Sequence, residues 1–412
     1  MTEPIPDLSQ ALEDAVADLF SVESVMLDVH VAGAVHLYGR FIADTEAAYP
    51  IVAARFRALG YTPFFREESG RPVILAIPGE LPSSKAKMWL PAVLFAATVV
   101  SVLAAWVLFN WTGEMRDLPA VVGNAALFAT TLLGILVAHE SGHYIVSRRL
   151  GIPASLPYFI PMPLSLLGTM GAVIVTRVPP RNRRHLLFLG MAGPLAGLLV
   201  AIPALVIGLS LSPVEPLAPL AAEGYGYSME GNSILYAAVK TAVFGRFLPD
   251  CDPRTPTTLG EALRTALSGC PYATGEDVLI GPVAFAAWAG LLVTALNLIP
   301  AGTLDGGHVA YALLGKRSYG LTRLVIIGLV GLGMWGVVRG FLQGQMEFFY
   351  GTLVWFLWAG LVSFFGRRPA VPLDDVTRLT GWQVALGLLV LLIFVLTFTP
   401  LPWLAIAPPA GP

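Results

Sequence analysis

The chain has 412 residues, of which 56% are hydrophobic and 13% are charged, and its mean hydropathy is +0.71. A soluble globular domain usually has about 25% charged residues, so the composition excludes an ordinary soluble protein and indicates an integral membrane protein in a lipid bilayer. The net charge of −2 gives no reason to expect a nucleic-acid partner.

The first 85 residues lack an apolar run long enough to cross a bilayer, so we predict a small soluble α/β domain over residues 1–85. The expected elements are helices at 8–21 and 44–59 and strands at 35–43, 61–65 and 72–77. Asp44 is a suitable helix cap, and Gly60 is typical of a helix end. The basic start of a secretory signal is not present, so we expect the first apolar span to remain in the protein.

Seven later segments are each near the ~20 apolar residues that cross a bilayer as a helix. They are 88–111, 119–150, 186–211, 278–300, 321–341, 348–365 and 381–404. Prolines interrupt the apolar stretch 152–176, for which we predict a re-entrant segment or a β-hairpin, because irregular backbone at membrane depth must lie against protein or water. The predicted fold is a polytopic α-helical membrane protein of about seven spans, with an embedded core at 88–365.

Basic residues predict the orientation, because cytoplasmic loops are enriched in Lys and Arg. They cluster at one end of several spans: Arg148, Arg149, Arg181, Arg183, Arg184, Lys316, Arg317, Arg367 and Arg368. We therefore expect a cytoplasmic N-terminal domain, and a cytoplasmic linker before the last span in 366–412. The loop 213–277 is then extracytoplasmic, with an amphipathic or interfacial helix. Its Cys251 and Cys270 could form a disulfide or remain two free thiols.

The motif His139-Glu140-Ser141-Gly142-His143 lies near the end of the second span. Histidines at i and i+4 share one helical face and can bind the same zinc ion, and the intervening glutamate can take a proton from water. Charged groups beside such an apolar run are costly unless they are functional. The competing interpretations are a chance pattern and a purely structural histidine–glutamate pair.

A catalytic zinc site usually has three protein ligands, so a third ligand is expected elsewhere in the chain. Asp305 is the best candidate, because it follows the fourth span at the cytoplasmic end and precedes two glycines; the alternative is a helix-capping aspartate. Asn297 could stabilise an oxyanion or make only an interhelical hydrogen bond. Pro300 is expected to end the helix between them.

These motifs together resemble the site-2 protease family of intramembrane zinc metalloproteases, most closely its chloroplast and cyanobacterial branch. The matching segments are HESGH at 139–143, LGTMGAVI at 167–174, AGPLAG at 192–197, GNS at 231–233, NLIP at 297–300 and LDGGH at 304–308. The resemblance implies one Zn²⁺ per chain on His139, His143 and Asp305, with catalysis by Glu140.

The resemblance also implies a transmembrane protein as substrate and a role in regulated proteolysis. The strand-like segment with Gly168 and Gly171 could bind an unwound substrate by β-addition, or could only close the cavity. We expect a bacterial or archaeal plasma membrane, with the active site toward the cytoplasm. The main alternative is a metal-ion transporter that uses the same ligands as a transit site; transporters often have inverted repeats, and none is evident here.

Overall fold

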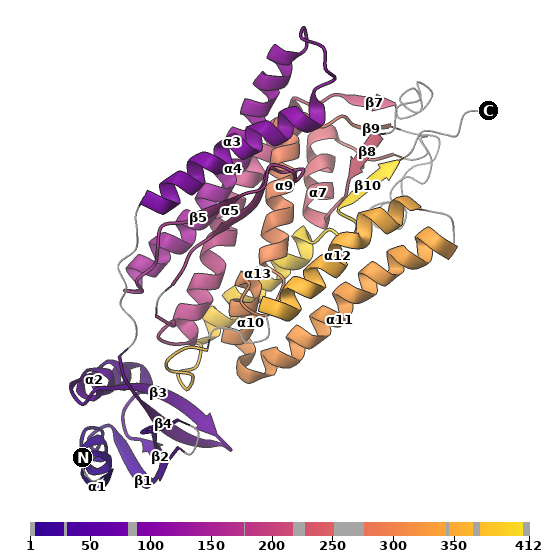
Figure 1. Ribbon diagram of the computed structural model, residues 1–412. Helices are drawn as coiled ribbons and strands as arrows, with labels where there is room; N and C mark the ends of the chain where they lie inside the picture. Colours follow the sequence, from indigo (N-terminus) through magenta and orange to yellow (C-terminus); the bar gives the residue numbers. More distant parts are fainter. Residues whose placement is uncertain are drawn as a thin grey trace.

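The computed structural model describes residues 5–28, 31–80, 89–176, 178–216, 227–250, 276–342, 346–365 and 371–406. A small α/β domain lies at one end of a bundle of long helices, and short strands lie at the opposite end (Figure 1). Cys251 and Cys270 fall outside the described residues, so their pairing stays a prediction.

The N-terminal domain contains α1 (Ile5–Asp14), β1 (Phe20–Leu27), β2 (Val35–Phe41), α2 (Thr45–Ala58), β3 (Tyr61–Glu68) and β4 (Arg71–Pro78). Its antiparallel sheet has the order β1-β2-β4-β3. The Asp44 side chain accepts a hydrogen bond from the Ala47 amide at the start of α2, and Gly60 follows that helix with a φ of +77°, as the sequence indicates.

The helix expected at residues 8–21 is too long, because α1 ends at Asp14 and β1 begins at Phe20. Phe20 is fully buried and joins the domain core, while most of the rest of β1 is exposed on the edge of the sheet. Pairing with β2 supplies hydrogen-bond partners that a short sequence window cannot reveal. The sequence pattern therefore missed one strand.

Each of the seven predicted apolar segments contains a helix. The helices of this part are α3 (Trp89–Asn110), α4 (Leu118–Arg149), α5 (Arg183–Ser210), α7 (Ile234–Phe244), α9 (Pro282–Asn297), α10 (Asp305–Leu314), α11 (Ser318–Val337), α12 (Met346–Phe365) and α13 (Gly381–Thr397). In the described part of the chain, four stretches are long and apolar enough to cross a membrane: α3, α4, α5 and the run from Asp305 to Leu342. The remaining apolar helices are shorter, so the number of spans stays a prediction.

The proline-rich stretch after α4 contains an antiparallel hairpin of β5 (Tyr158–Pro161) and β6 (Thr169–Val173). The hairpin lies beside α3 because Gly168 approaches that helix closely. Ser101 of α3 donates a 2.6 Å hydrogen bond to the Gly168 carbonyl, and a Cβ on Gly168 would lie 2.5 Å from the Cα of Val102. Gly168 has a φ of +71°, which favours glycine.

The end of the bundle opposite the N-terminal domain carries two small sheets (Figure 1). In one, β7 (Val214–Pro216) pairs with β9 (Glu276–Val278); in the other, β8 (Tyr227–Glu230) pairs with β10 (Trp403–Ile406). The helix expected in loop 213–277 is α7. Its Lys240 is fully buried and lies 2.9 Å from Asp277 and 3.6 Å from Glu230, a charge cluster that the apolar pattern does not indicate.

Residues 371–380, expected to be a cytoplasmic linker, lie against the edge strand β3, where Asp374 forms an isolated parallel bridge with Phe65. The Phe65 amide donates to the Leu373 carbonyl at 3.0 Å, and the Asp375 amide donates to the Phe65 carbonyl at 3.1 Å. Asp375 also accepts from Arg183 at 2.9 Å and from the Tyr311 hydroxyl at 3.0 Å. This segment therefore joins the N-terminal domain to α5 and α10.

Candidate metal centre

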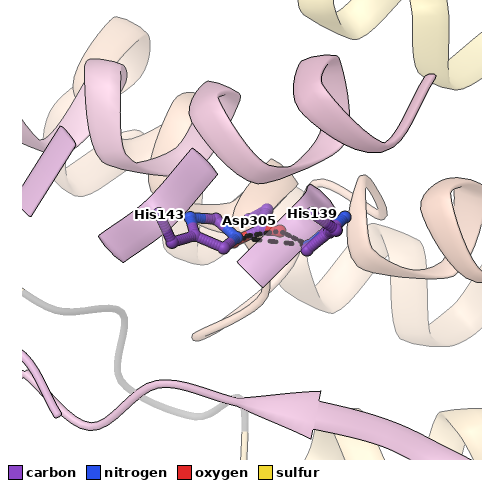
Figure 2. Close-up of side chains that lie close together, drawn as sticks. All are labelled: His139, His143 and Asp305. Carbon is purple, nitrogen blue, oxygen red and sulfur yellow. Dashed lines mark hydrogen bonds and ion pairs between the residues drawn. The ribbon is translucent and has the colours of Figure 1, made fainter. Parts of the chain in front are cut away.

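The side chains of His139, His143 and Asp305 converge inside the helical bundle (Figure 2). The Nε2 atoms of the two histidines are 3.2 Å apart. The Oδ2 atom of Asp305 lies 3.2 Å from Nε2 of His143 and 3.3 Å from Nε2 of His139. In the described part of the chain, this is the one group of at least three His, Cys, Asp or Glu residues with the geometry to hold a metal ion.

The three distances form a nearly equilateral triangle, which can be compared with the geometry of zinc. Ligand atoms that bind one zinc at about 2.0–2.1 Å in a tetrahedral arrangement lie about 3.3 Å from one another. The observed sides of 3.2, 3.2 and 3.3 Å agree with that value. Two imidazoles and one carboxylate are also a donor set that zinc accepts, so the residues fit Zn²⁺.

Close packing of α4 against α5 fixes the orientation of His143. Its Nδ1 lies 2.9 Å from the carbonyl oxygen of Leu189. Because a carbonyl only accepts hydrogen bonds, this contact places the proton on Nδ1 and leaves the Nε2 lone pair for a metal. A Cβ at Gly193 would lie 2.1 Å from Nε2 of His143, and one at Gly142 would lie 2.4 Å from the Ala192 carbonyl oxygen.

Asp305 reaches the two histidines because α9 ends at Asn297 and α10 begins at Asp305. The intervening turn is compact. A Cβ on Gly306 would lie 1.9 Å from the carbonyl oxygen of Leu298, and a Cβ on Gly307 would lie 2.3 Å from that of Gly302. The two glycines therefore permit the first turn of α10 to close against the preceding loop, which places Asp305 at the helix start.

A cavity of about 290 Å³ opens over the three side chains. Glu140 lines it and is 5% exposed. Asn297 lines it as well, with its Nδ2 3.4 Å from Nε2 of His139. Residues 172–174 and Thr176, in and after β6, form another part of its wall. The cavity thus combines the metal triangle, a buried carboxylate, a side-chain amide and extended backbone.

Five residues were expected to bind the metal or to take part in catalysis, and all of them line this cavity: His139, Glu140, His143, Asn297 and Asp305. Gly168 and Gly171 do not line it. Gly168 instead packs against α3, and a Cβ on Gly171 would meet no atom within 4 Å. His308 does line the cavity, and its buried Nδ1 has no hydrogen-bond partner among the described residues.

The sequence interpretation missed the contribution of Gly193 and Leu189 to the site. The Gly193-x-x-x-Gly197 pattern predicts a helix-packing face, and the structure shows that this face lies against the two histidines. The Cβ positions of Gly193 and Gly197 would be 2.1 Å from His143 Nε2 and 3.4 Å from His139 Nδ1, respectively. The pattern was therefore the available signal, but it does not reveal that imidazole rings are the neighbours.

Residues 127–328, which include the whole metal triangle, match the family model described as Peptidase family M50. The chain contains a peptidase family M50 domain. This finding confirms the resemblance to the site-2 proteases that the motifs indicate.

The chain is also similar to curated plant proteins. It is 28% identical over 348 residues to "Probable zinc metalloprotease EGY2, chloroplastic" of Arabidopsis thaliana, covering 82% of this chain and 54% of the relative. It is 30% identical over 302 residues to "Probable zinc metalloprotease EGY1, chloroplastic" of the same organism, covering 72% and 47%. The EGY2 protein of Oryza sativa subsp. indica is 27% identical over 346 residues, covering 82% and 55%.

The chain spans about half the length of these curated relatives. No solved structure matches it significantly. The family and the three relatives carry the names of peptidases and metalloproteases, so the comparisons give no support to the transporter alternative.

Proposed function

We propose that the protein is a zinc-dependent endopeptidase that cleaves transmembrane segments of membrane proteins within the bilayer, in regulated proteolysis. The observation that carries this proposal is the nearly equilateral triangle of His139, His143 and Asp305 beside Glu140, between long apolar helices. The M50 domain and the names of the relatives support the same function.

In this proposal, His139, His143 and Asp305 hold one Zn²⁺ per chain. When bound, zinc lowers the pKa of a water molecule toward neutrality and polarises the scissile carbonyl group. Glu140 is the general base: it accepts a proton from the attacking water and donates it to the leaving amine. The burial of Glu140 in the same cavity supports this role, because a base must lie within reach of the proton that it removes.

Asn297 is proposed to bind the substrate carbonyl oxygen as negative charge develops on it. Its amide nitrogen lies 3.4 Å from Nε2 of His139, on the cavity side of the metal triangle. An amide donor held at such a position stabilises the oxyanion more than the ground-state carbonyl.

We assign substrate binding to the β5–β6 hairpin that contains Gly168 and Gly171. A helical substrate must unwind before its backbone can reach the catalytic groups. Within the described residues β6 has one sheet neighbour, β5, while residues 172–174 line the cavity. An unwound segment can pair with the second edge of β6 by β-addition. Gly168 then anchors the hairpin to α3, and Gly171 leaves space beside the added strand.

We propose seven spans with a re-entrant β5–β6 hairpin and a cytoplasmic N-terminal domain. The basic residues at the ends of α4 and α5 support this orientation, which places the metal triangle toward the cytoplasmic side. Residues 213–277 then lie on the other face. A bacterial or archaeal plasma membrane stays a prediction; the names of the plant relatives describe them as chloroplastic.

The proposed function can be tested with the purified chain in detergent and a library of synthetic transmembrane peptides. Cleavage products are identified by mass spectrometry before and after treatment with a zinc chelator. We expect wild-type protein to cut within apolar segments, the chelator to stop cleavage, and added Zn²⁺ to restore it. Cleavage that is insensitive to the chelator would contradict the proposal.

A further inference from the structure

A second cavity, of about 680 Å³, lies between the N-terminal domain and the helical bundle. Its walls come from the β3–β4 turn, the junction of α10 with α11, α5 through Arg183, and residues 375–384. It shares no lining residue with the cavity over the metal triangle. Its volume lies within the range of about 300–1,000 Å³ that is typical of small-molecule sites.

The charged side chains of this cavity are mostly basic. Four of its lining residues are cationic and two are anionic, which leaves a net charge of +2; they are Arg183, Lys316, Arg317, Arg378, Glu67 and Asp375. Part of the remaining wall is apolar and includes Leu313, Leu379 and Val384. The cavity therefore combines a positive charge with an apolar side.

The four cationic side chains differ in the hydrogen bonds and ion pairs that they already make within the protein. Arg183 donates to Asp375 at 2.9 Å, and Lys316 donates one hydrogen bond to the Glu67 carbonyl at 3.2 Å. The side chains of Arg317 and Arg378 have no hydrogen bond or ion pair with the part of the chain that the structure describes. Each of these two guanidinium groups offers five N–H donors in a planar fork, which suits phosphate oxygens.

We propose that this cavity binds a phosphate-bearing anion of the monoester class. A phosphomonoester carries about −1.5 to −2 charges at neutral pH, which matches the net +2 of the lining residues. Arg317 and Arg378 supply bidentate hydrogen bonds to the phosphate oxygens, and Lys316 adds its remaining donors. The phosphate belongs either to a free anion or to a lipid headgroup, whose chains would follow the apolar side of the cavity.

The site also connects the N-terminal domain with the helix that carries Asp305. Asp375 lines the cavity and accepts a 3.0 Å hydrogen bond from Tyr311, and Tyr311 belongs to α10, which begins at Asp305. A bound anion attracts Arg183, which is the ion-pair partner of Asp375. Occupancy therefore changes the contacts of the segment that holds α10, and this link does not depend on which reaction the metal triangle performs.

The test measures binding to the full-length chain in two arms. Inorganic phosphate is titrated calorimetrically into protein in uncharged detergent. In the second arm, native mass spectrometry counts the lipids retained from nanodiscs of phosphatidylcholine, with or without phosphatidic acid. The variant is Arg317→Gln combined with Arg378→Gln. Arg323→Gln is the matched control, because Arg323 is an exposed arginine of α11, the helix that follows Arg317, and does not line the cavity.

We expect wild-type protein to bind at least one of the two probes, and the double variant to lose on the order of 100-fold in affinity, because each lost guanidinium group contributes about tenfold or more. The control should stay within about twofold of wild type. Binding in the phosphate arm alone identifies a free anion, and binding of phosphatidic acid alone identifies a lipid; both support the site.

Three results would overturn the proposal: no binding of either probe to wild type, unchanged binding by the double variant, or an equal loss in Arg323→Gln, which would show a general surface-charge effect. If the double variant does not fold, Arg317→Lys with Arg378→Lys replaces it. These lysines keep the charge but lose the planar fork, so affinity should fall by about tenfold, and unchanged affinity would again count against the site.

Discussion

Gly193 presents its bare Cα to the ring of His143, so closely that a Cβ there would lie 2.1 Å from the Nε2 atom. Gly193→Ala must therefore displace the imidazole from the metal triangle. Since a displacement of about 1 Å at a catalytic group can cost 10²-fold in rate, we expect peptide cleavage to fall by about that factor and zinc affinity to fall with it. The measurement is cleavage rate beside zinc content after dialysis.

The matched control for this substitution is Gly197→Ala on the same helix. The added Cβ there would lie 3.4 Å from the nearest atoms of His139, which is an ordinary contact distance, and we expect most of the activity to remain. Equal losses in the two variants would show that α5 tolerates no added methyl group, rather than that Gly193 positions His143.

Glu140→Gln should separate metal binding from catalysis. Glutamine has nearly the same shape but cannot accept the proton from water, and general-base catalysis contributes about 10²–10⁴-fold. We expect cleavage to fall by that range while one zinc per chain remains bound. Zinc is measured by elemental analysis on the same sample as the rate. Turnover at the wild-type rate in this variant would exclude Glu140 as the base.

Lys240 should be essential for the stability of the end of the bundle that carries the two small sheets. It is fully buried between Asp277 and Glu230, so Lys240→Met leaves two buried carboxylates without their cation. Loss of one partner of a buried ion pair typically costs about 3–5 kcal/mol. The measurement is the free energy of unfolding in mixed micelles.

The control for Lys240→Met is Arg246→Gln, which removes an exposed ion pair with Glu276 and should cost at most about 1 kcal/mol. Similar losses of unfolding free energy in the two variants would refute the prediction.

Asp375 should hold the N-terminal domain against the bundle. Asp375→Ala removes the ion pair with Arg183 and the hydrogen bond from Tyr311, and hydrogen bonds to charged groups contribute about 1.5–3 kcal/mol. We expect faster hydrogen exchange at the Phe65 amide, which bonds to Leu373. Tyr311→Phe removes one of these contacts and should have a smaller effect. Unchanged exchange in Asp375→Ala would show that other contacts hold the domain.

The parts of the fold that depend on local pattern could be predicted from the sequence. The seven apolar segments contain helices, and Pro300 lies in the break between α9 and α10, because hydropathy and proline act within a few residues. The strand β1 was missed because its edge position depends on pairing with β2. The short helix α10 was also missed. Its ten residues follow a turn with Pro300 and Gly302, and these residue types indicate a loop rather than the start of a helix.

The two histidines of the candidate site could be predicted from the motif, because residues at i and i+4, such as His139 and His143, lie on the same face of a helix. Asp305 required an assumption about topology, namely that α4 and α9 end on the same side. The roles of Leu189 and Gly193 depend on the packing of α5 against α4, which no local pattern specifies. The buried position of Lys240 likewise depends on two carboxylates from distant strands.

The central claim is that His139, His143 and Asp305 share one zinc ion, and X-ray absorption at the zinc edge tests it most directly. In purified wild-type protein we expect one zinc per chain with nitrogen and oxygen ligands at about 2.0–2.2 Å, two of them imidazoles. In Asp305→Ala the zinc content should fall well below one per chain. A full complement of zinc with an unchanged absorption spectrum in Asp305→Ala would contradict the claim.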